Sequence, residues 1–444
     1  MRNGGSVPEA TGSGGAAAPA GGAASLPFPL PPTFPPGVNP ETYRLAEVTD
    51  LLRRAAYFSL FSVHDPQAPN QVYTLPGSPN VLVGLQVNEN THRFDVRVLE
   101  PEWGGQGGLL ASNRVGQLAA HVNIDWLVIP EDFHAAPDRV PPPTPLNPMQ
   151  SQRFTMMNGS FTFVDRDGSG IRGFGAGRTF PGLAGQEPVL YIGANIDALE
   201  GFGRLEGLQG NVVVNGYIRP PQDLFINVML RVMDPDERLL TEQRLEPLQP
   251  IPDPDPTSVY MTFLGEQDPN EPTTLNAGPG GLTGSSVHEL LRLVHLSFDL
   301  GRDDLGLRSK SQVGPVVAKL AATLLFNPLD PATPGTAETP IPYQTCCGEF
   351  SFLNQSGDVF ATLASNIVEG RAFQTALPGA PMPVFRMVGF GPFLRGTGAF
   401  EGVTGMLSMN GVVSVFPRTL SNLYIFRLND PDGRFRAALR NSWS

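Results

Sequence analysis

Short apolar stretches, many of them β-branched or aromatic, alternate with polar residues along most of this chain. Alternation with a period of two is typical of β-strands. Gly, Pro, Asn and Asp separate the stretches, and residues 165–168 and 354–357 have the composition of hairpin turns in which a glycine takes a positive φ. The clearest of the predicted strands cover residues 154–157, 160–164, 189–193, 211–215 and 224–232. We therefore predict an all-β protein of the sandwich or closed-barrel type.

Two segments show a helical period as well. Residues 41–56 contain good helix formers, and Leu45, Val48, Leu51 and Leu52 have helical spacing, so we predict a helix there. Residues 285–293 begin with serines that can cap a helix, but their counterpart near residues 81–87 has the pattern of a strand. The sequence leaves both interpretations of this second segment open.

A long repeat organises the chain. The run GFGRLEGLQG at residues 201–210 returns as GTGAFEGVTG at residues 396–405, at an offset of 195 positions. Further matches follow in the same order, and they pair residues 115–120 with 313–318, 159–164 with 348–353 and 230–236 with 426–432. Solenoid and propeller repeats have periods of roughly 20–50 residues, so a period this long indicates a duplicated domain.

The duplication and the composition together divide the chain into five parts. We predict a disordered Gly/Ala/Pro arm at 1–40, the helix at 41–56, a β-barrel unit at 57–245, a proline-rich linker at 246–258 and a second β-barrel unit at 259–440. The expected fold is thus two tandem antiparallel β-barrels that form a pseudo-dimer, preceded by a helix.

The charge balance narrows the possible partners. The formal net charge is −12, and no run of Lys or Arg occurs, which argues against binding to nucleic acid. No apolar stretch is long enough to predict a membrane span, and the N-terminus lacks the apolar core of a secretory signal, so we expect a cytoplasmic protein. The two cysteines, Cys346 and Cys347, are adjacent and cannot form a tetrahedral zinc site by themselves.

The glycine-rich run resembles a known family. Its Gly-x-Gly-x-Phe-Glu-Gly-x-x-Gly pattern, together with the preceding Gly-x-Phe-x-Phe strand, is similar to the late hairpin of the allene oxide cyclase and dirigent superfamily. This resemblance implies eight-stranded antiparallel barrels that enclose an apolar cavity, and some members of the superfamily are cyclases without a cofactor. The family barrels are usually separate chains, whereas here two units share one chain, and no catalytic residue of the family can be matched position by position.

Four residues that recur in both units are candidates for catalysis. Glu206 and Glu401 occupy equivalent positions, and a carboxylate inside an apolar barrel can serve as a general acid or base. The alternative is a turn glutamate that accepts hydrogen bonds from backbone amides or pairs with Arg231 or Arg427. His92 and His295 are also equivalent, each followed by an aspartate, but the two spacings place a His–Asp pair on one face in the second unit only, unless a strand carries a bulge.

Aromatic and methionine side chains supply what an apolar pocket requires, or equally a packed core. The candidate ligand-binding residues are Phe161, Phe163, Tyr191, Met229, Phe350, Phe352, Phe385 and Met387. We predict no metal site and no cofactor, since no set of ligands has suitable spacing.

From the sequence we expect the chain to bind an apolar small molecule in a barrel cavity, with a cofactor-independent cyclase or isomerase activity as one form of that function. The alternative is a non-catalytic structural protein that self-associates through its barrels and its N-terminal arm.

Overall fold

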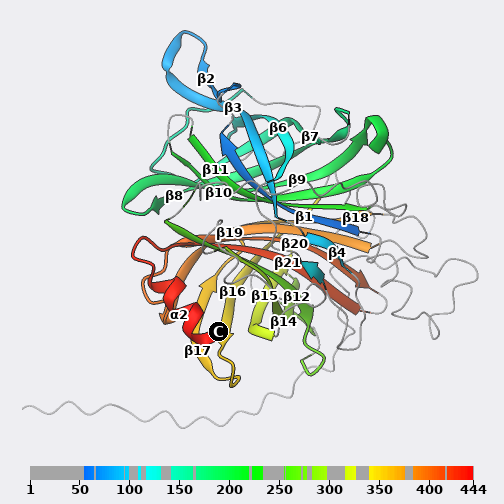
Figure 1. Cartoon of the computed structure of the whole chain (residues 1–444), viewed down its shortest axis with the longest axis vertical. Helices are drawn as coiled ribbons and strands as arrows, with labels where there is room; N and C mark the ends of the chain where they lie inside the picture. The colour runs from blue at the N-terminus through cyan, green and yellow to red at the C-terminus, as the bar shows by residue number, and fades with distance from the viewer. Residues whose placement is uncertain are drawn as a thin grey trace, which may run out of the picture.

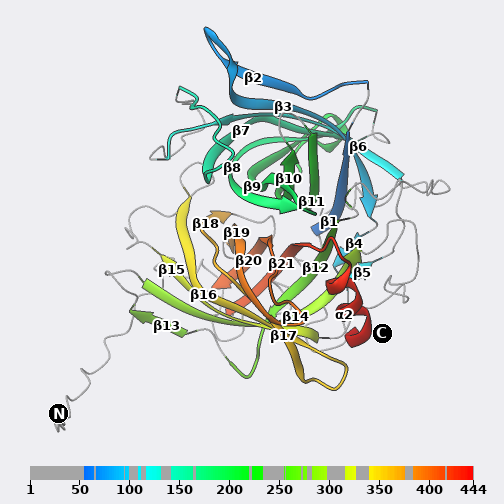
Figure 2. The ribbon, with the colours of Figure 1, turned by 90° about the vertical axis from the view of Figure 1, so that its left-hand side faces the viewer.

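The computed structural model describes residues 55–64, 67–94, 96–99, 109–111, 117–131, 142–163, 167–219, 223–233, 255, 257–271, 274–277, 283–297, 316–326, 340–375, 384–415 and 418–443. These residues form two curved antiparallel sheets that lie one above the other (Figures 1 and 2). The predicted arm at 1–40 lies outside the described residues, as does most of the predicted helix. Within the described part of the chain, no helix has the length and apolar character needed to cross a membrane.

The first sheet closes into an eight-stranded antiparallel barrel. Its strands follow the order β1-β11-β10-β9-β8-β7-β6-β3, and a further pairing of β1 with β3 closes the ring, while β2 adds to the outside of β3. The strands are β1 (Ala55–His64), β2 (Gln71–Leu75), β3 (Ser78–Phe94), β6 (Gln117–Val128), β7 (Gln152–Phe163), β8 (Gly170–Ala184), β9 (Glu187–Phe202), β10 (Gln209–Arg219) and β11 (Asp223–Met233). A short ladder of β4 (Val96–Leu99) and β5 (Leu109–Ala111) forms a separate two-stranded sheet, and β4 contacts β1 of the barrel.

The second sheet repeats this order. It runs β12-β21-β20-β19-β17-β16-β15-β14, and β12 pairs with β14 to close the ring. Strands β17 and β18 both pair with β16 and β19, so together they fill the place that β8 holds in the first barrel. The strands are β12 (Ser258–Gln267), β13 (Thr274–Ala277), β14 (Thr283–Ser297), β15 (Val316–Phe326), β16 (Ile341–Leu353), β17 (Val359–Ser365), β18 (Glu369–Thr375), β19 (Val384–Gly398), β20 (Gly405–Val415) and β21 (Arg418–Asn429). The closed sheets remove the exposed strand edges that an open sheet would present.

Glycine turns appear where the sequence predicts them. Gly357 has a φ of 84° and its N–H donates to the Asn354 carbonyl, which confirms the turn at 354–357. The strands predicted in the first unit lie in β7, β9, β10 and β11, apart from residue 164, which lies outside the described residues. Residues 285–293 lie within the strand β14, which settles the choice left open above in favour of a strand.

The helix predicted at residues 41–56 is wrong at its C-terminal end. Residues 41–54 lie outside the described part of the chain, but Ala55 and Ala56 belong to β1, where they pair with Met233 and Val232 of β11. Pairing with a neighbouring strand outweighs helix propensity at these two alanines. The described helix of three turns lies instead at the C-terminus, as α2 (Arg434–Trp443), and it covers one end of the second barrel (Figure 1).

The two barrels pack together through β9 and β10 of the first and β19 and β20 of the second, and buried amides lie between them. Asn211 donates to the Asn410 side chain at 3.0 Å, and Asn215 donates to the Met406 carbonyl at 2.9 Å. At the offset of 195, Asn211 corresponds to Met406 and Asn215 to Asn410, so the second contact is the first with the two units exchanged. The interface therefore has an approximate twofold relation, as expected for a duplicated unit that packs against its copy.

A buried ion pair also joins the linker to both barrels. The Nε of Arg427 lies 3.3 Å from Asp255 Oδ2, and the two side chains are 0 % and 1 % exposed. The guanidinium stacks over the rings of Tyr191 and Tyr217 from the first barrel, at 5.0 and 4.2 Å from their centroids. Tyr260 completes the cluster by donating to Asp255 at 3.0 Å.

Candidate functional site

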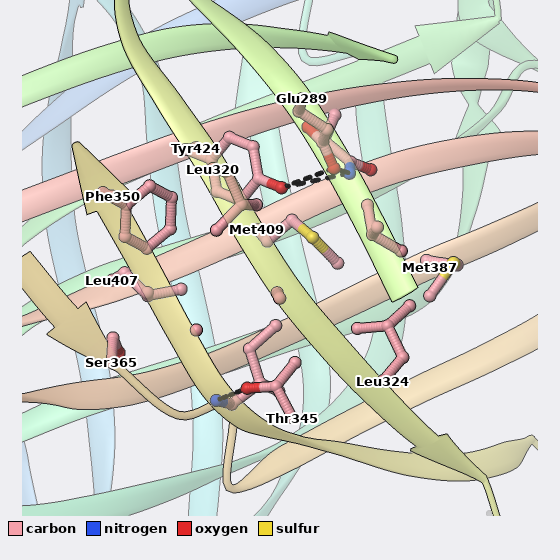
Figure 3. A pocket seen from close by; sticks show the side chains of 15 residues that line it. Glu289, Leu320, Leu324, Thr345, Phe350, Ser365, Met387, Leu407, Met409 and Tyr424 are labelled. Atoms are coloured by element: carbon pink, nitrogen blue, oxygen red, sulfur yellow. Dashed lines mark hydrogen bonds between the residues drawn. The ribbon is translucent and has the colours of Figure 1, made fainter. Parts of the chain in front are cut away.

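The lumen of the second barrel contains a cavity with a polar end. Its lining residues are mainly apolar, but five carry polar side chains. The lining residues are Val287, Glu289, Leu320, Ala322, Leu324, Thr345, Gly348, Phe350, Ser365, Ile367, Met387, Leu407, Met409, Asn422 and Tyr424. Figure 3 shows Glu289 and Tyr424 at one end of this cavity and Thr345 at the other.

Glu289 supplies the carboxyl group of the cavity lining, and this residue is 1 % exposed. Its Oε1 accepts a hydrogen bond from Asn422 Nδ2 at 2.7 Å and another from the Tyr424 hydroxyl at 3.0 Å. Its Oε2 has no hydrogen-bond partner among the described residues. A buried polar atom without a partner costs free energy, so Oε2 is the atom at which a ligand or a water molecule gains most by binding.

The strand order explains how Glu289 reaches its partners. Glu289 lies on β14, whereas Asn422 and Tyr424 lie two residues apart on β21 and so share one face of that strand. Strand β12 separates β14 from β21, and its residue Gly265 pairs with Leu291 of β14 and with Asn422 of β21. A Cβ atom on residue 265 would overlap Glu289 Oε2 and lie 2.8 Å from the Tyr424 ring. The carboxyl group therefore crosses β12 above a glycine that leaves room for it.

Burial sets the acidity of this group. Desolvation raises the pKa of Glu289 from 4.5 to about 7, and the hydrogen bonds from Tyr424 and Asn422 oppose the shift in part. The same burial, with the nearby carboxylate, raises the pKa of Tyr424 well above 10, so this residue remains a neutral phenol. The site thus holds a carboxyl group that is partly protonated near neutral pH beside a permanent hydrogen-bond donor.

Among the other polar groups of the lumen, Asn422 Oδ1 also has no hydrogen-bond partner among the described residues, whereas three hydroxyl groups are bonded within the barrel. Thr345 Oγ1 accepts from the Ile367 N–H at 2.6 Å, and Ser365 donates to the Pro392 carbonyl at 2.9 Å. The Tyr343 hydroxyl donates to the Val388 carbonyl at 3.1 Å. Chemistry at this cavity therefore centres on Glu289.

The cavity is small. Its volume is about 30 Å³, which is room for about two water molecules. A larger ligand requires the surrounding side chains to move. Met387 and Met409 lie on the wall, and methionine changes its shape at lower cost than branched or aromatic side chains do.

The predicted ligand-binding residues separate into five groups. Phe350 and Met387 line the cavity, whereas Phe352 and Phe385 are buried in the core of the same barrel without lining it. Phe161 and Phe163 belong to the core of the first barrel. Tyr191 packs between the barrels, and the side chain of Met229 lies outside the described part of the chain.

The two glutamates of the repeated run lie on the surface. Glu206 and Glu401 are both exposed and follow glycines with positive φ, Gly203 at 65° and Gly398 at 58°. Neither side chain enters a lumen, and Arg427 pairs with Asp255 rather than with Glu401. The residues before them, Leu205 and Phe400, point inward instead and are almost fully buried. The location favours the turn alternative for both glutamates, and their catalytic role stays a prediction without support from this geometry.

His92 and His295 lie on the equivalent strands β3 and β14. Each strand has a register irregularity there, between Thr91 and His92 in one pairing and opposite His295 in the other. The side chains of both histidines and the aspartates that follow them lie outside the described part, so the proposed dyad stays a prediction. Among described residues, no group of three or more His, Cys, Asp or Glu could hold a metal ion.

Glu289 is not among the residues predicted from the sequence, although the sequence contains a signal for it. The pattern Gly-x-x-Val-x-Glu occurs at residues 84–89 and again at 284–289, at a constant offset of 200. In a strand, a glutamate two residues after an inward-facing valine also faces inward. This repeat is harder to recognise than the glycine-rich run, because its two copies share one glycine rather than four.

No protein-family model matches the chain, and no match was found among curated proteins. Among solved structures, the fold is similar over part of the chain to a pterocarpan synthase dirigent protein, with 14% sequence identity and a TM-score of 0.23. The match covers 38% of this chain and 83% of that one. A match at this score says nothing about a ligand or a reaction, so the candidate site stands on its own geometry.

Proposed function

We propose that the second barrel binds a small, mainly apolar molecule that carries a carbonyl oxygen, and that protonated Glu289 donates a hydrogen bond to this oxygen. The observation that supports the proposal is the buried carboxyl group whose Oε2 has no partner while its other oxygen accepts two hydrogen bonds. The apolar wall of the cavity favours a ligand with little other polarity.

The hydrogen bonds around Glu289 determine where its proton resides. Oε1 faces two donors, Asn422 Nδ2 and the Tyr424 hydroxyl, so a proton on this oxygen would be repelled. The proton of the neutral acid therefore resides on Oε2, which then acts as a donor. A donor in an apolar site is complementary to an acceptor such as a ketone, aldehyde or enone oxygen.

The same arrangement suits proton transfer. A carboxyl group with a pKa of about 7 gives up and recovers a proton at neutral pH with little cost. Isomerisation or ring closure of a carbonyl compound needs such a group to polarise the oxygen, and Tyr424 would hold the Glu289 carboxylate in place between the two states.

The alternative of a purely structural protein is favoured by the small volume of the cavity. If the lumen side chains do not move, no organic molecule fits, and Glu289 is then a buried group solvated by one or two water molecules. Binding experiments separate these two functions.

The test measures binding of 2-cyclohexen-1-one to the purified full chain by saturation-transfer NMR at pH 6 and pH 8. We expect binding at pH 6 and an affinity about tenfold weaker at pH 8, since the ionised carboxylate repels the carbonyl oxygen. Native mass spectrometry of the same preparation checks for a molecule that co-purifies in the lumen.

Two variants of Glu289 test whether its carboxyl group is responsible for the binding. Glu289→Gln keeps a donor of the same shape but cannot ionise, so binding should persist without pH dependence. Glu289→Leu removes the donor, and binding should be lost. Equal binding by wild type and Glu289→Leu, or no binding by wild type at either pH, would overturn the proposal and favour the structural alternative.

A further inference from the structure

Both barrels contain a buried glutamate at the same place in the sheet. Glu89 lies on β3 opposite His64 of β1 and Val122 of β6. Glu289 lies on β14 opposite Gln267 of β12 and Leu320 of β15. Strands β3 and β14 hold the same position in their sheets, and each glutamate is 1 % exposed. The two carboxyl groups are thus copies of one ancestral residue.

Their surroundings differ. Both oxygens of Glu89 accept hydrogen bonds, from Ser62 Oγ to Oε2 at 2.8 Å and from Asn70 Nδ2 to Oε1 at 2.7 Å. Glu289 has two donors on Oε1 and none on Oε2 among the described residues. The carboxyl group of the first barrel is consequently saturated, while that of the second barrel is not.

Three positions account for this difference. At the offset of 196 that relates β11 to β21, the first barrel has Ile226 and Val228 where the second has Asn422 and Tyr424. The third position lies on the strand between. Ser62 pairs with Thr91, two residues after Glu89, and Gly265 pairs with Leu291, two residues after Glu289. Ser62 and Gly265 are therefore equivalent. In the first barrel the serine side chain occupies the space above the strand and binds the glutamate. In the second barrel the glycine leaves this space to the carboxyl group itself, which extends to Asn422 and Tyr424.

The residues that line the two cavities differ in the same way. The cavity of the first barrel also has a volume of about 30 Å³, but every residue that lines it is apolar and Glu89 is not among them. It is lined by Val87, Ile124, Trp126, Phe154, Met156, Ile192, Ala194, Val214, Leu224 and Ile226. An apolar cavity of this kind stays dry and offers nothing to orient a ligand.

We infer that the two barrels have divided their roles, with the second as the binding unit and the first as a scaffold, and that Gly265, where the first barrel has Ser62, is required for the role of the second. This inference rests on the proposed function for its ligand. The ligand class is the one named there, a small apolar carbonyl compound, and Gly265 is a positioning residue that determines whether the carboxyl group reaches the lumen.

The experiment exchanges the two residues one at a time. Gly265→Ser places a side chain where Glu289 Oε2 now lies, so Glu289 should withdraw from Asn422 and Tyr424, and the affinity for 2-cyclohexen-1-one should fall at least about tenfold. Gly265→Ala should have the same effect through its Cβ alone. The matched control, Ser62→Gly in the first barrel, should leave the affinity unchanged, and circular dichroism confirms that each variant is folded.

A second readout does not depend on a ligand. With glutamate labelled at the δ-carbon, NMR follows the ionisation of single carboxyl groups, and Glu289→Gln and Glu89→Gln identify the two resonances. We expect Gly265→Ser to change the chemical shift of the Glu289 resonance and the pH at the midpoint of its titration. Ser62→Gly should leave both as they are in the wild type.

The outcomes separate this inference from the proposed function. If wild type binds the enone and folded Gly265→Ser binds it equally well with an unaltered Glu289 resonance, the role of Gly265 is refuted while the binding site stands. Loss of binding in Ser62→Gly or Glu89→Gln, but not in Gly265→Ser, would assign the site to the first barrel. If wild type binds nothing but the resonances respond as expected, the proposed function fails and the control of the carboxyl group by Gly265 holds.

Discussion

At the scale of single residues, the environment of a glutamate matters more than its presence in a repeated motif. The glutamates of the glycine-rich run, Glu206 and Glu401, are exposed in turns, while Glu289 is buried in a lumen and has a pKa raised to about 7. The sequence shows both kinds as residues that recur in the two units. Whether such a glutamate is exposed or buried depends on its place in the closed sheet, and the pattern of a single strand does not reveal that place.

Because Glu289 binds its proton more tightly in the folded protein than in the unfolded chain, it makes stability depend on pH. Its contribution is fully present below the ordinary pKa of 4.5, decreases as the pH rises, and is lost above about 7. This difference corresponds to on the order of 3 kcal/mol in the free energy of unfolding. Denaturant titrations of wild type and Glu289→Gln at pH 5 and pH 7.5 measure it.

We expect the wild type to lose about 2 kcal/mol relative to Glu289→Gln between the two pH values, because part of the full difference falls below pH 5. Other carboxyl groups titrate equally in both proteins, so their contribution cancels in the comparison. An identical pH dependence for the two proteins would show that Glu289 is not desolvated to this degree.

At the scale of elements, strands were predictable and the terminal helix was missed. Strand alternation is a local property, and the predicted strands coincide with β7, β9, β10 and β11 over the residues that the structure describes. The helix α2 has Phe435, Leu439 and Trp443 at helical spacing, with two N–H groups of its first turn bonded to Asp430. Both features are present in the sequence, directly after the apolar stretch that forms β21.

Helix α2 closes the core of the second barrel. Leu439 is fully buried, and the Trp443 ring stacks on Phe352 with 6.2 Å between centroids. Leu439→Ala should therefore lower the free energy of unfolding by about 2–5 kcal/mol through lost burial and the cavity left behind. The exposed neighbour Asn441 provides the control, since Asn441→Ala should change stability by less than about 0.5 kcal/mol.

Thermal or denaturant unfolding of both variants measures this effect. Similar stabilities for Leu439→Ala and Asn441→Ala would mean that α2 contributes little to the core. That result would contradict the role in the core that we infer from the burial of Leu439 and the stacking of Trp443 on Phe352.

At the scale of the whole molecule, the linker contributes to the packing of the two barrels. Asp255 is buried with Arg427 of β21, and Arg427 also contacts Tyr191 and Tyr217 of the first barrel. Removing one charge of a buried pair leaves the other uncompensated. Asp255→Asn should consequently destabilise the chain by about 3–5 kcal/mol.

Asp167→Asn is the matched control because Asp167 pairs with Arg204 at an exposed site. An exposed pair contributes roughly 0–1 kcal/mol, so this variant should unfold nearly as the wild type does. Denaturant unfolding, followed by tryptophan fluorescence, compares the two. Equal effects of both substitutions would show that the buried pair does not stabilise the junction.

The sequence by itself determined the all-β class, the turns and the duplication into two like units. Alternation and turn glycines are properties of neighbouring residues, and a repeat is found by comparing the sequence with itself. Only the tertiary structure decided which glutamate enters a lumen and how the copies differ. Glu289 meets Asn422 and Tyr424 across a strand that carries Gly265, whereas Glu89 is bonded to Ser62 and Asn70. Such contacts join residues on strands far apart in the sequence, and their free energy depends on burial that exists only once the sheet has closed.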